Sequence, residues 1–480
     1  MQNSMKEWQT DLKLHHIKGT IEVPNVKIRR GIFQGDSLSP LLFVLSIDPL
    51  SRILNKLETG YNMRKRNQDD QFTINHQLYM DDLKLYNSRE KEMKNQLKKV
   101  KEFSDDIRME FGIDKCKKIT ILHGKQQPMP DFNIDQDTII KELDKEEHYK
   151  YLGILEASGI DHKLMRKTIK KEYIYRLRKI VKTNLTPKNK ITAINQLATP
   201  VIQYSFGVVN WPQYSLDEID RKTRKLLTMN KLFYKQQSHA RLYLPRAEGG
   251  MGLIEINTSH RATTISTYKY LTTATDNNLK EVLNHEKTKP QTTSTVELGQ
   301  NFLRQENIEE DDLVQKEDRT PTQLAKKSRR KYIKTINKKL HEEKKQDKRA
   351  GPIKKVLDSE YVDKEGSVKW LREGLLRYDG ERIILRAQDQ GLTTRATLHL
   401  QDKNKDPSCR FCKKTQESPS HLLSCCDTLL KQGEYTTHHN KVCNLIHWNI
   451  LGEKNIERCD KYWKHQPEKG ILSKNDWDIY

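Results

Sequence analysis

The chain has 480 residues, of which 35% are hydrophobic, and this length is enough for about three domains with modest cores. Lys and Arg number 87 against 65 Asp and Glu, so the formal net charge is +22, which favours nucleic acid over a membrane as the partner. No apolar run approaches the ~20 residues of a spanning helix, and the first residues lack the apolar core of a secretion signal. We therefore expect a protein of the nucleus or cytoplasm.

The first third of the chain alternates strand patterns with apolar helix patterns. In chain order we expect a strand over 19–30, a helix over 40–57, a strand–turn–strand over 78–86, a helix over 88–111, a strand over 116–122 and a strand pair over 148–156. The helix over 88–111 is predicted because its apolar residues recur at three- and four-residue steps.

Two adjacent carboxylates, Asp81 and Asp82, lie at the predicted turn of the strand–turn–strand Leu78 to Tyr86. Like charges side by side repel, and a bound hard cation with oxygen ligands is the usual compensation. An ordinary polar hairpin tip would have the same local pattern. The pattern therefore becomes informative only together with a second segment upstream.

That second segment is GIFQGDSLSP, from Gly31 to Pro40. Gly31 and Gly35 allow the backbone to approach a base pair closely, since no Cβ intervenes. Gln34 carries both a donor and an acceptor, which suits a minor-groove contact with little sequence preference. Alone, this segment would be a plain entry into a helix, but its order and spacing relative to Asp81 make the two segments informative together.

The rest of the chain divides by composition. Residues 160–275 are expected to form an all-helical domain that opens with a strongly basic helix over 162–182. Residues 276–350 are expected to be a linker, first polar and then basic. The basic run over 326–349 favours a solvated helix or linker face, and the alternative is a phosphate-binding or nuclear-import segment.

Six of the seven cysteines lie beyond residue 400, which favours metal ligation over a disulfide framework. Cys409, Cys412, His421 and Cys426 have the spacing Cys-x2-Cys-x8-His-x4-Cys, a ligand set for tetrahedral Zn²⁺. Metal binding would supply folding energy to a segment too polar to build its own core. Cys425 is an adjacent rival for the fourth position.

The two boxes around Gln34 and Asp81 together resemble the palm of a reverse transcriptase, with its Gln-Gly-x-x-x-Ser-Pro and Tyr-x-Asp-Asp motifs. The resemblance implies an α+β fold, with an antiparallel palm sheet and packing helices, a helical thumb and a small zinc-knuckle module. It implies Mg²⁺ (or Mn²⁺) on Asp81 and Asp82, the second contributing less directly. The resemblance also implies that Tyr79 and Met80 line the primer terminus and that Gln34 and Gly35 contact the template. Lys115 or Lys117 would assist the leaving pyrophosphate, and Gly153 would belong to the primer-grip hairpin.

A knuckle placed after a reverse transcriptase and thumb is similar to non-LTR retrotransposons that carry a C-terminal restriction-like endonuclease. This resemblance implies four regions: a partial palm over 1–158, a thumb over 160–275, the linker over 276–350, and a pre-endonuclease region over 351–480 with the knuckle at 409–426. It implies RNA template, DNA primer or target, and dNTP as partners, and it leaves the oligomeric state open.

A reverse transcriptase palm needs a third carboxylate from an earlier strand, and no matching segment precedes Gly31. We therefore expect the chain to begin past that motif and to polymerise poorly by itself. The alternative is a non-catalytic nucleic-acid-binding remnant of a retrotransposon. A prokaryotic or organellar intron-type enzyme is disfavoured by the knuckle.

Overall fold

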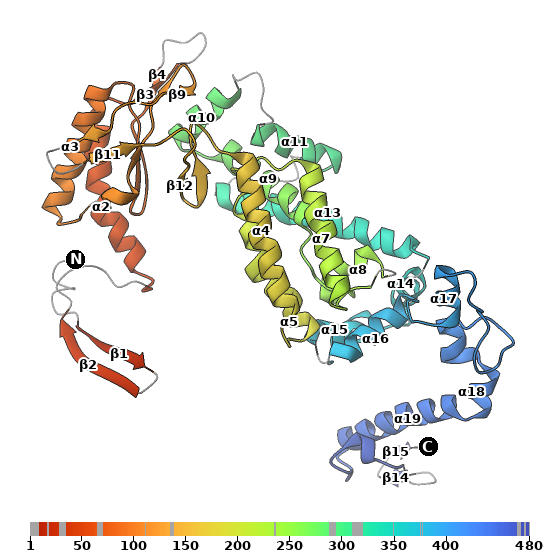
Figure 1. The fold of residues 1–480 in the computed structure, drawn as a ribbon. Helices are drawn as coiled ribbons and strands as arrows, with labels where there is room; N and C mark the ends of the chain where they lie inside the picture. The colour runs from red at the N-terminus through yellow and green to blue at the C-terminus, as the bar shows by residue number, and fades with distance from the viewer. Residues whose placement is uncertain are drawn as a thin grey trace. The chain divides into compact units, whose positions relative to one another are not determined.

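A computed structural model of the protein divides into two compact units, one comprising Met1–Met165 and Leu271–Ser294, the other Arg166–Tyr270 and Thr295–Tyr480 (Figure 1). Strands are concentrated in the first unit and helices in the second, a mixed architecture of helices and small sheets that agrees with the expected α+β class. The structure describes residues 9–16, 19–27, 35–64, 71–110, 112–134, 139–234, 237–287, 294–309, 320–348, 350–374, 376, 378–467, 472–474 and 477–479.

The first unit contains small sheets and short helices. Its strands are β1 (Gln9–His16), β2 (Gly19–Lys27), β3 (Tyr61–Arg64), β4 (Gln71–Ile74), β5 (His76–Tyr79), β6 (Asp82–Leu85), β7 (Lys117–Lys118), β8 (Ile121–Leu122), β9 (Lys125–Gln126), β10 (Phe132–Asn133), β11 (Ile139–Glu142), β12 (Tyr149–Tyr151) and β13 (Ile154–Glu156). Its helices are α2 (Ser39–Asn55), α3 (Glu90–Asp106), the 3₁₀ turn η1 (Ile113–Lys115) and α10 (Asn277–Lys287). Most strands pair as antiparallel hairpins, whereas β11 pairs with β10 and, in parallel, with β7.

The core of this unit joins the two long helices to the hairpin β5–β6. Leu50 and Leu54 of α2 pack with Val100 of α3, and Leu83 and Leu85 of β6 lie against this cluster. The helices were predicted over 40–57, from a start signal and an apolar run, and over 88–111, from apolar periodicity, and both predictions are confirmed. The hairpin is thereby fixed on a buried base while its tip faces outward.

The second unit is almost entirely helical. Its first helices are α4 (His162–Val181, which begins in the first unit), α5 (Pro187–Ala193), the π-helical turn η2 (Ile194–Ala198), α6 (Thr199–Gln203), α7 (Gln213–Met229), α8 (His239–Tyr243), η3 (Arg246–Glu248) and α9 (Ile256–Thr273). Its later elements are α11 (Thr295–Gln305), α13 (Pro321–Gln346), α14 (Gly351–Leu357), α15 (Lys364–Glu373), α16 (Tyr378–Gln388), α17 (Arg395–Gln401), η4 (His421–Cys425), α18 (Asp427–Lys431), α19 (Glu434–Glu453), η5 (Tyr462–Lys464), β14 (Leu472–Lys474) and β15 (Trp477–Ile479).

The segment 276–350, expected to be a linker, is instead largely helical. It contains α10, α11 and the long helix α13. Tyr332 of α13 and Leu303 of α11 are buried in one core cluster with Ile265 of α9. The basic run was predicted as a solvated helix or linker face, and α13 is a helix, held in place because it buries one face however basic its other faces are.

Two ion pairs connect α8 and η3 to α16 and to the residue that follows it. The guanidinium of Arg241 lies 2.6 Å from the carboxylate of Asp389, and both side chains are 1% exposed. Arg246 donates two hydrogen bonds to Glu381, at 3.1 and 2.7 Å. Nearby, Lys344 of α13 is fully buried, and burial lowers its pKa to about 7. These contacts join segments that are far apart in the sequence.

We expect Asp389→Asn to destabilise the second unit by about 3–5 kcal/mol, because it leaves the Arg241 guanidinium buried without its counter-charge. Chemical denaturation followed by circular dichroism measures the change. The matched control is Glu365→Gln, which breaks an exposed pair with Arg372 and should cost far less, because water and salt screen that pair. Equal effects of the two substitutions would contradict this assignment.

The buried side chain of His260 in α9 is expected to make stability depend on pH. Its ring lies edge-on to Phe206, with 5.0 Å between centroids, and burial followed by the charge of Arg261 lowers its pKa to about 4. The folded state therefore keeps the ring neutral, whereas the unfolded chain binds a proton below about pH 6.5. The stability that this site contributes is present above pH 6.5 and is lost as the pH falls towards 4.

His260→Phe should remove that acid sensitivity. Between pH 7 and pH 4 the wild type should lose about 3 kcal/mol more unfolding free energy than the variant, since one pKa unit corresponds to about 1.4 kcal/mol. Denaturation curves of both proteins at pH 7, 6, 5 and 4 measure this difference. Parallel pH profiles would show that His260 titrates normally in the fold.

In the part of the chain that the structure describes, no helix is both long enough and apolar enough to cross a membrane.

Candidate functional site: the acidic hairpin and the cysteine cluster

The acidic hairpin has the predicted strand–turn–strand form. Tyr79 of β5 pairs with Asp82 of β6, so Met80 and Asp81 form a two-residue loop between them. Met80 has φ +53°, a left-handed conformation that costs a non-glycine residue about 1–2 kcal/mol. Asp81 and Asp82 are both exposed, and they extend from a turn whose backbone is fixed by the strand pairing.

Polar contacts hold the base of this hairpin to the two helices behind it. The side chain of Asn75 donates to the carbonyl of Leu54 at 2.7 Å, and Gln96 of α3 donates to the carbonyl of Asn75 at 2.8 Å. Ser51 of α2 shares a 2.8 Å hydrogen bond with His76. Hydrogen bonds to both α2 and α3 therefore fix the position of the hairpin.

A second hairpin, β12–β13, lies beside the first. Lys84 of β6 forms an ion pair with Glu156 of β13, and its ammonium lies 4.9 Å from the ring centroid of Tyr151. Burial, followed by the charges of Cys116 and Asp82, raises the pKa of Tyr149. The turn of this second hairpin is Leu152-Gly153, with φ +46° and +81°, as a two-residue turn of type I′ requires.

The other sequence-predicted site residues occupy different positions. Gln34 lies outside the described residues, and Gly35, the first described residue after it, has φ +97°, a conformation that favours glycine. Lys115 is exposed at the end of η1. Lys117 instead pairs with Glu147 at 3.1 Å, which leaves Lys115 as the better candidate of the two lysines.

The hairpin tip suits a hard divalent cation. Mg²⁺ is usually held by one or two carboxylates together with substrate phosphates and water, and two exposed adjacent carboxylates match that donor set. Among the described residues, no third His, Cys, Asp or Glu joins them in a metal-binding group. The tip therefore offers two carboxylates to a cation and, among the described residues, no third ligand of these types.

Residues 3–155 match the family described as reverse transcriptase (RNA-dependent DNA polymerase). The matched range contains both the acidic hairpin and the segment around Gly35. The chain is also 28% identical over 268 residues to the "Retrovirus-related Pol polyprotein from type-1 retrotransposable element R2" of Popillia japonica. The chain carries a reverse transcriptase domain of the non-LTR retrotransposon type. The match covers 53% of this chain and 41% of that relative, so the chain spans less than half of the relative's length.

The predicted cysteine cluster of this retrotransposon chain lies in the second unit. The ligand atoms of Cys409, Cys412, His421 and Cys426 all lie within 4.8 Å of one another. The sulfurs of Cys409 and Cys426 are 3.9 Å apart, and Cys412 Sγ lies 3.3 Å from His421 Nε2. Cys425, the rival candidate, is exposed and lies beside Ser424 instead.

The donor chemistry of the cluster fits Zn²⁺, which takes thiolate and imidazole ligands in a tetrahedron. Backbone N–H groups, that of Lys414 first, lower the pKa of Cys412 to about 6. Thr415 Oγ1 lies 3.2 Å from His421 Nδ1 and can orient the ring while Nε2 faces Cys412.

Sequence reasoning missed the residues that support both sites. In the knuckle, the fully buried carboxylate of Glu417 accepts hydrogen bonds from the backbone N–H and the side chain of Arg410, at 3.0, 2.8 and 2.6 Å. Tyr435 of α19 accepts from the backbone N–H of Cys426 at 3.0 Å. In the palm, the missed residue is Lys84. Glu417 and Lys84 lie within the stretches that contain the two motifs but are not motif residues, and Tyr435 and Glu156 lie outside them, so no local pattern marks these contacts.

Proposed function

We propose that the first unit is the metal-binding part of an RNA-directed DNA polymerase that copies RNA from a DNA primer. The observation that carries this proposal is the pair Asp81 and Asp82 at the tip of a rigid hairpin, beside a second hairpin that contains Gly153. The family match over residues 3–155 supports the same chemistry. The substrates would be an RNA template, a DNA primer and dNTP.

In this proposal Asp81 and Asp82 hold Mg²⁺ or Mn²⁺, which neutralises charge on the phosphate oxygens during transfer. Tyr79 and Met80 lie at the same tip and would contact the primer terminus. Gln34 and Gly35 would contact the template, and Lys115 would assist the leaving pyrophosphate. Lys84 would keep the two hairpins together, because it pairs with Glu156 across them.

We propose that the regions beyond the palm hold the nucleic acid. Residues 160–275 would form the thumb, and the knuckle at 409–426 within 351–480 would bind Zn²⁺ and contact target DNA. The net charge of +22 supports a polyanionic partner. Such substrates place the protein in the nucleus or cytoplasm.

A second candidate function is nucleic-acid binding without catalysis. It is favoured by one observation, that no third metal-binding side chain joins Asp81 and Asp82 among the described residues. Two carboxylates alone would hold a metal loosely and leave the two-metal geometry incomplete. We therefore expect the 480-residue chain by itself to extend a primer at close to the background rate.

The test is a comparison of this chain with a chimera. The chimera places the corresponding upstream palm segment of the Popillia japonica relative in frame before residue 9. Incubated with Mg²⁺, an RNA template, a DNA primer and dNTPs, the chimera should extend the primer well above the chain alone. A folded chimera that binds the primer–template without extending it would favour the binding function.

A further inference from the structure

The helix α13 is held in place by one of its faces. Ala325, Ser328 and Tyr332 are buried, and Tyr332 belongs to the core cluster with residues of α9 and α11. A capping box between Thr320 and Gln323 closes its N-terminus. The buried face therefore fixes the helix, and with it the position of the side chains on its exposed side.

The exposed side of α13 carries an evenly spaced row of positive charges, called here the basic stripe: Lys326, Arg330, Lys334 and Lys338. All four are exposed, at steps of four residues. Since an α-helix rises 1.5 Å per residue, neighbouring members are about 6 Å apart along the axis and the stripe spans about 18 Å. Between residues 321 and 341 the sequence contains eight Lys and Arg and no Asp or Glu.

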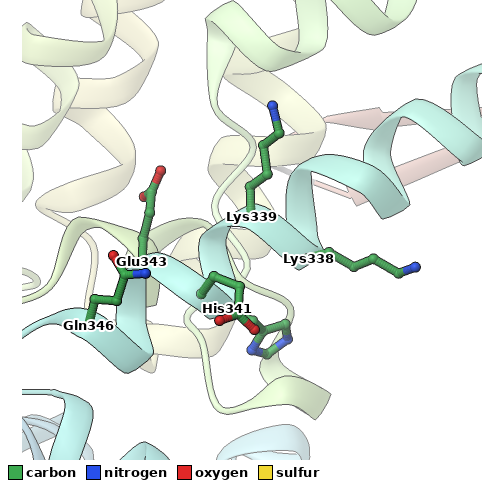
Figure 2. A pocket seen from close by; sticks show the side chains of 6 residues that line it. Lys338, Lys339, His341, Glu343 and Gln346 are labelled. Carbon is green, nitrogen blue, oxygen red and sulfur yellow. The ribbon is translucent and has the colours of Figure 1, made fainter. Parts of the chain in front are cut away.

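The basic stripe is not neutralised by other described parts of the protein. Of the lysines at the exposed end of α13, Lys339 pairs with Glu306 at 2.6 Å, but no stripe residue is in an ion pair with another described residue. Lys338 lines an open cavity of about 630 Å³, and Figure 2 shows its side chain directed away from those of Glu343 and Gln346.

The other basic helix, α4, differs in this respect. Lys170 forms an ion pair with Glu218, and Arg176 pairs with Glu172 at 2.7 Å. Arg166 donates to the carbonyl of Asn210 at 2.6 Å. Part of the positive charge of α4 therefore stabilises the fold, whereas the charge of the stripe remains available to a ligand.

We propose that the basic stripe of α13 binds the phosphate backbone of a nucleic acid without reading its sequence. Each strand of a B-form duplex presents one phosphate per 3.4 Å of axis, so about five phosphates lie along the 18 Å of the stripe. Lys and Arg side chains that reach phosphates supply affinity but no base discrimination. This binding goes beyond the proposed copying reaction and does not depend on Asp81.

The test is the salt dependence of duplex binding by the full-length protein. The stripe variant is K326Q/R330Q/K334Q/K338Q, and the control variant K355Q/K369Q/K431Q/K441Q removes the same charge from exposed positions of the same unit, outside the proposed thumb and knuckle. Fluorescence anisotropy with two duplexes of unrelated sequence gives the slope of log affinity against log salt. The stripe variant should flatten that slope by about three to four, since each lost phosphate contact contributes about 0.9.

We expect the same loss on both duplexes and an unchanged slope in the control variant. The proposal is overturned if the wild type does not bind, if the stripe variant keeps the wild-type slope, if both quadruple variants lose equally, or if the loss is confined to one sequence. Circular dichroism checks that the variants are folded. Because primer extension is not measured, failure here is separate from failure of the proposed polymerase.

Discussion

Asp81→Asn is expected to lower primer extension by the chimera at least about 100-fold. The substitution keeps the shape of the side chain but removes a charged oxygen ligand at the hairpin tip, and a tenfold loss corresponds to only about 1.4 kcal/mol of barrier. Asp82→Asn should have a smaller effect, because we assign the more direct metal contact to Asp81. Single-nucleotide extension rates at saturating Mg²⁺ measure both.

The control is Asp114→Asn, which removes an exposed carboxylate in η1 of the same unit. It should leave the extension rate within about twofold of the unsubstituted chimera, since charges exposed to water and salt interact weakly at a distance. Loss of activity in all three variants would mean that net charge, and not the hairpin, governs the rate. Full activity of Asp81→Asn would end the assignment of the metal site.

Removing one ligand of the knuckle is expected to abolish zinc binding by the full-length protein. Cys409→Ser should reduce the zinc content from about one ion per chain to almost none, because structural zinc sites need all four ligands. The region around the cluster should then lose protection from hydrogen exchange, since zinc binding supplies its folding free energy. Inductively coupled plasma mass spectrometry and hydrogen exchange measure the two effects.

The adjacent cysteines provide an internal control. Cys426→Ser should behave like Cys409→Ser, because its sulfur lies within the cluster. Cys425→Ser should keep its zinc, because that side chain is exposed and lies beside Ser424. The opposite outcome, zinc lost with Cys425→Ser and kept with Cys426→Ser, would reassign the fourth ligand.

The features that could be predicted from sequence are those encoded over short distances. The turn at Asp81 follows from alternation on either side of it, and the cluster of three cysteines and one histidine follows from their spacing. The choice between Cys425 and Cys426 could not be predicted, because it depends on how the chain leaves η4 and on the contact between Cys426 and Tyr435.

The remainder of the fold depends on distant partners. Residues 276–350 resemble a linker in composition. Nothing in the segment itself indicates that Tyr332 packs in a core with residues of α9 and α11. In the same way, Lys84 is one lysine among many until Glu156, 72 residues later, is placed beside it. The number of charged residues in the sequence gives the sign of the surface charge, but it does not show which lysines form ion pairs within the fold.

The arginines of α8 and η3 also bear on how this chain tolerates change in length. Arg241 and Asp389 are 148 residues apart in sequence yet share a hydrogen bond of 2.8 Å, and Arg246 reaches Glu381 over a similar gap. The helices α9, α11 and α13 lie between them and pack in one core, so insertions are expected to be tolerated in the loops between these helices and not within them. Such changes would leave α8 and η3 attached to α16 and to the residue that follows it.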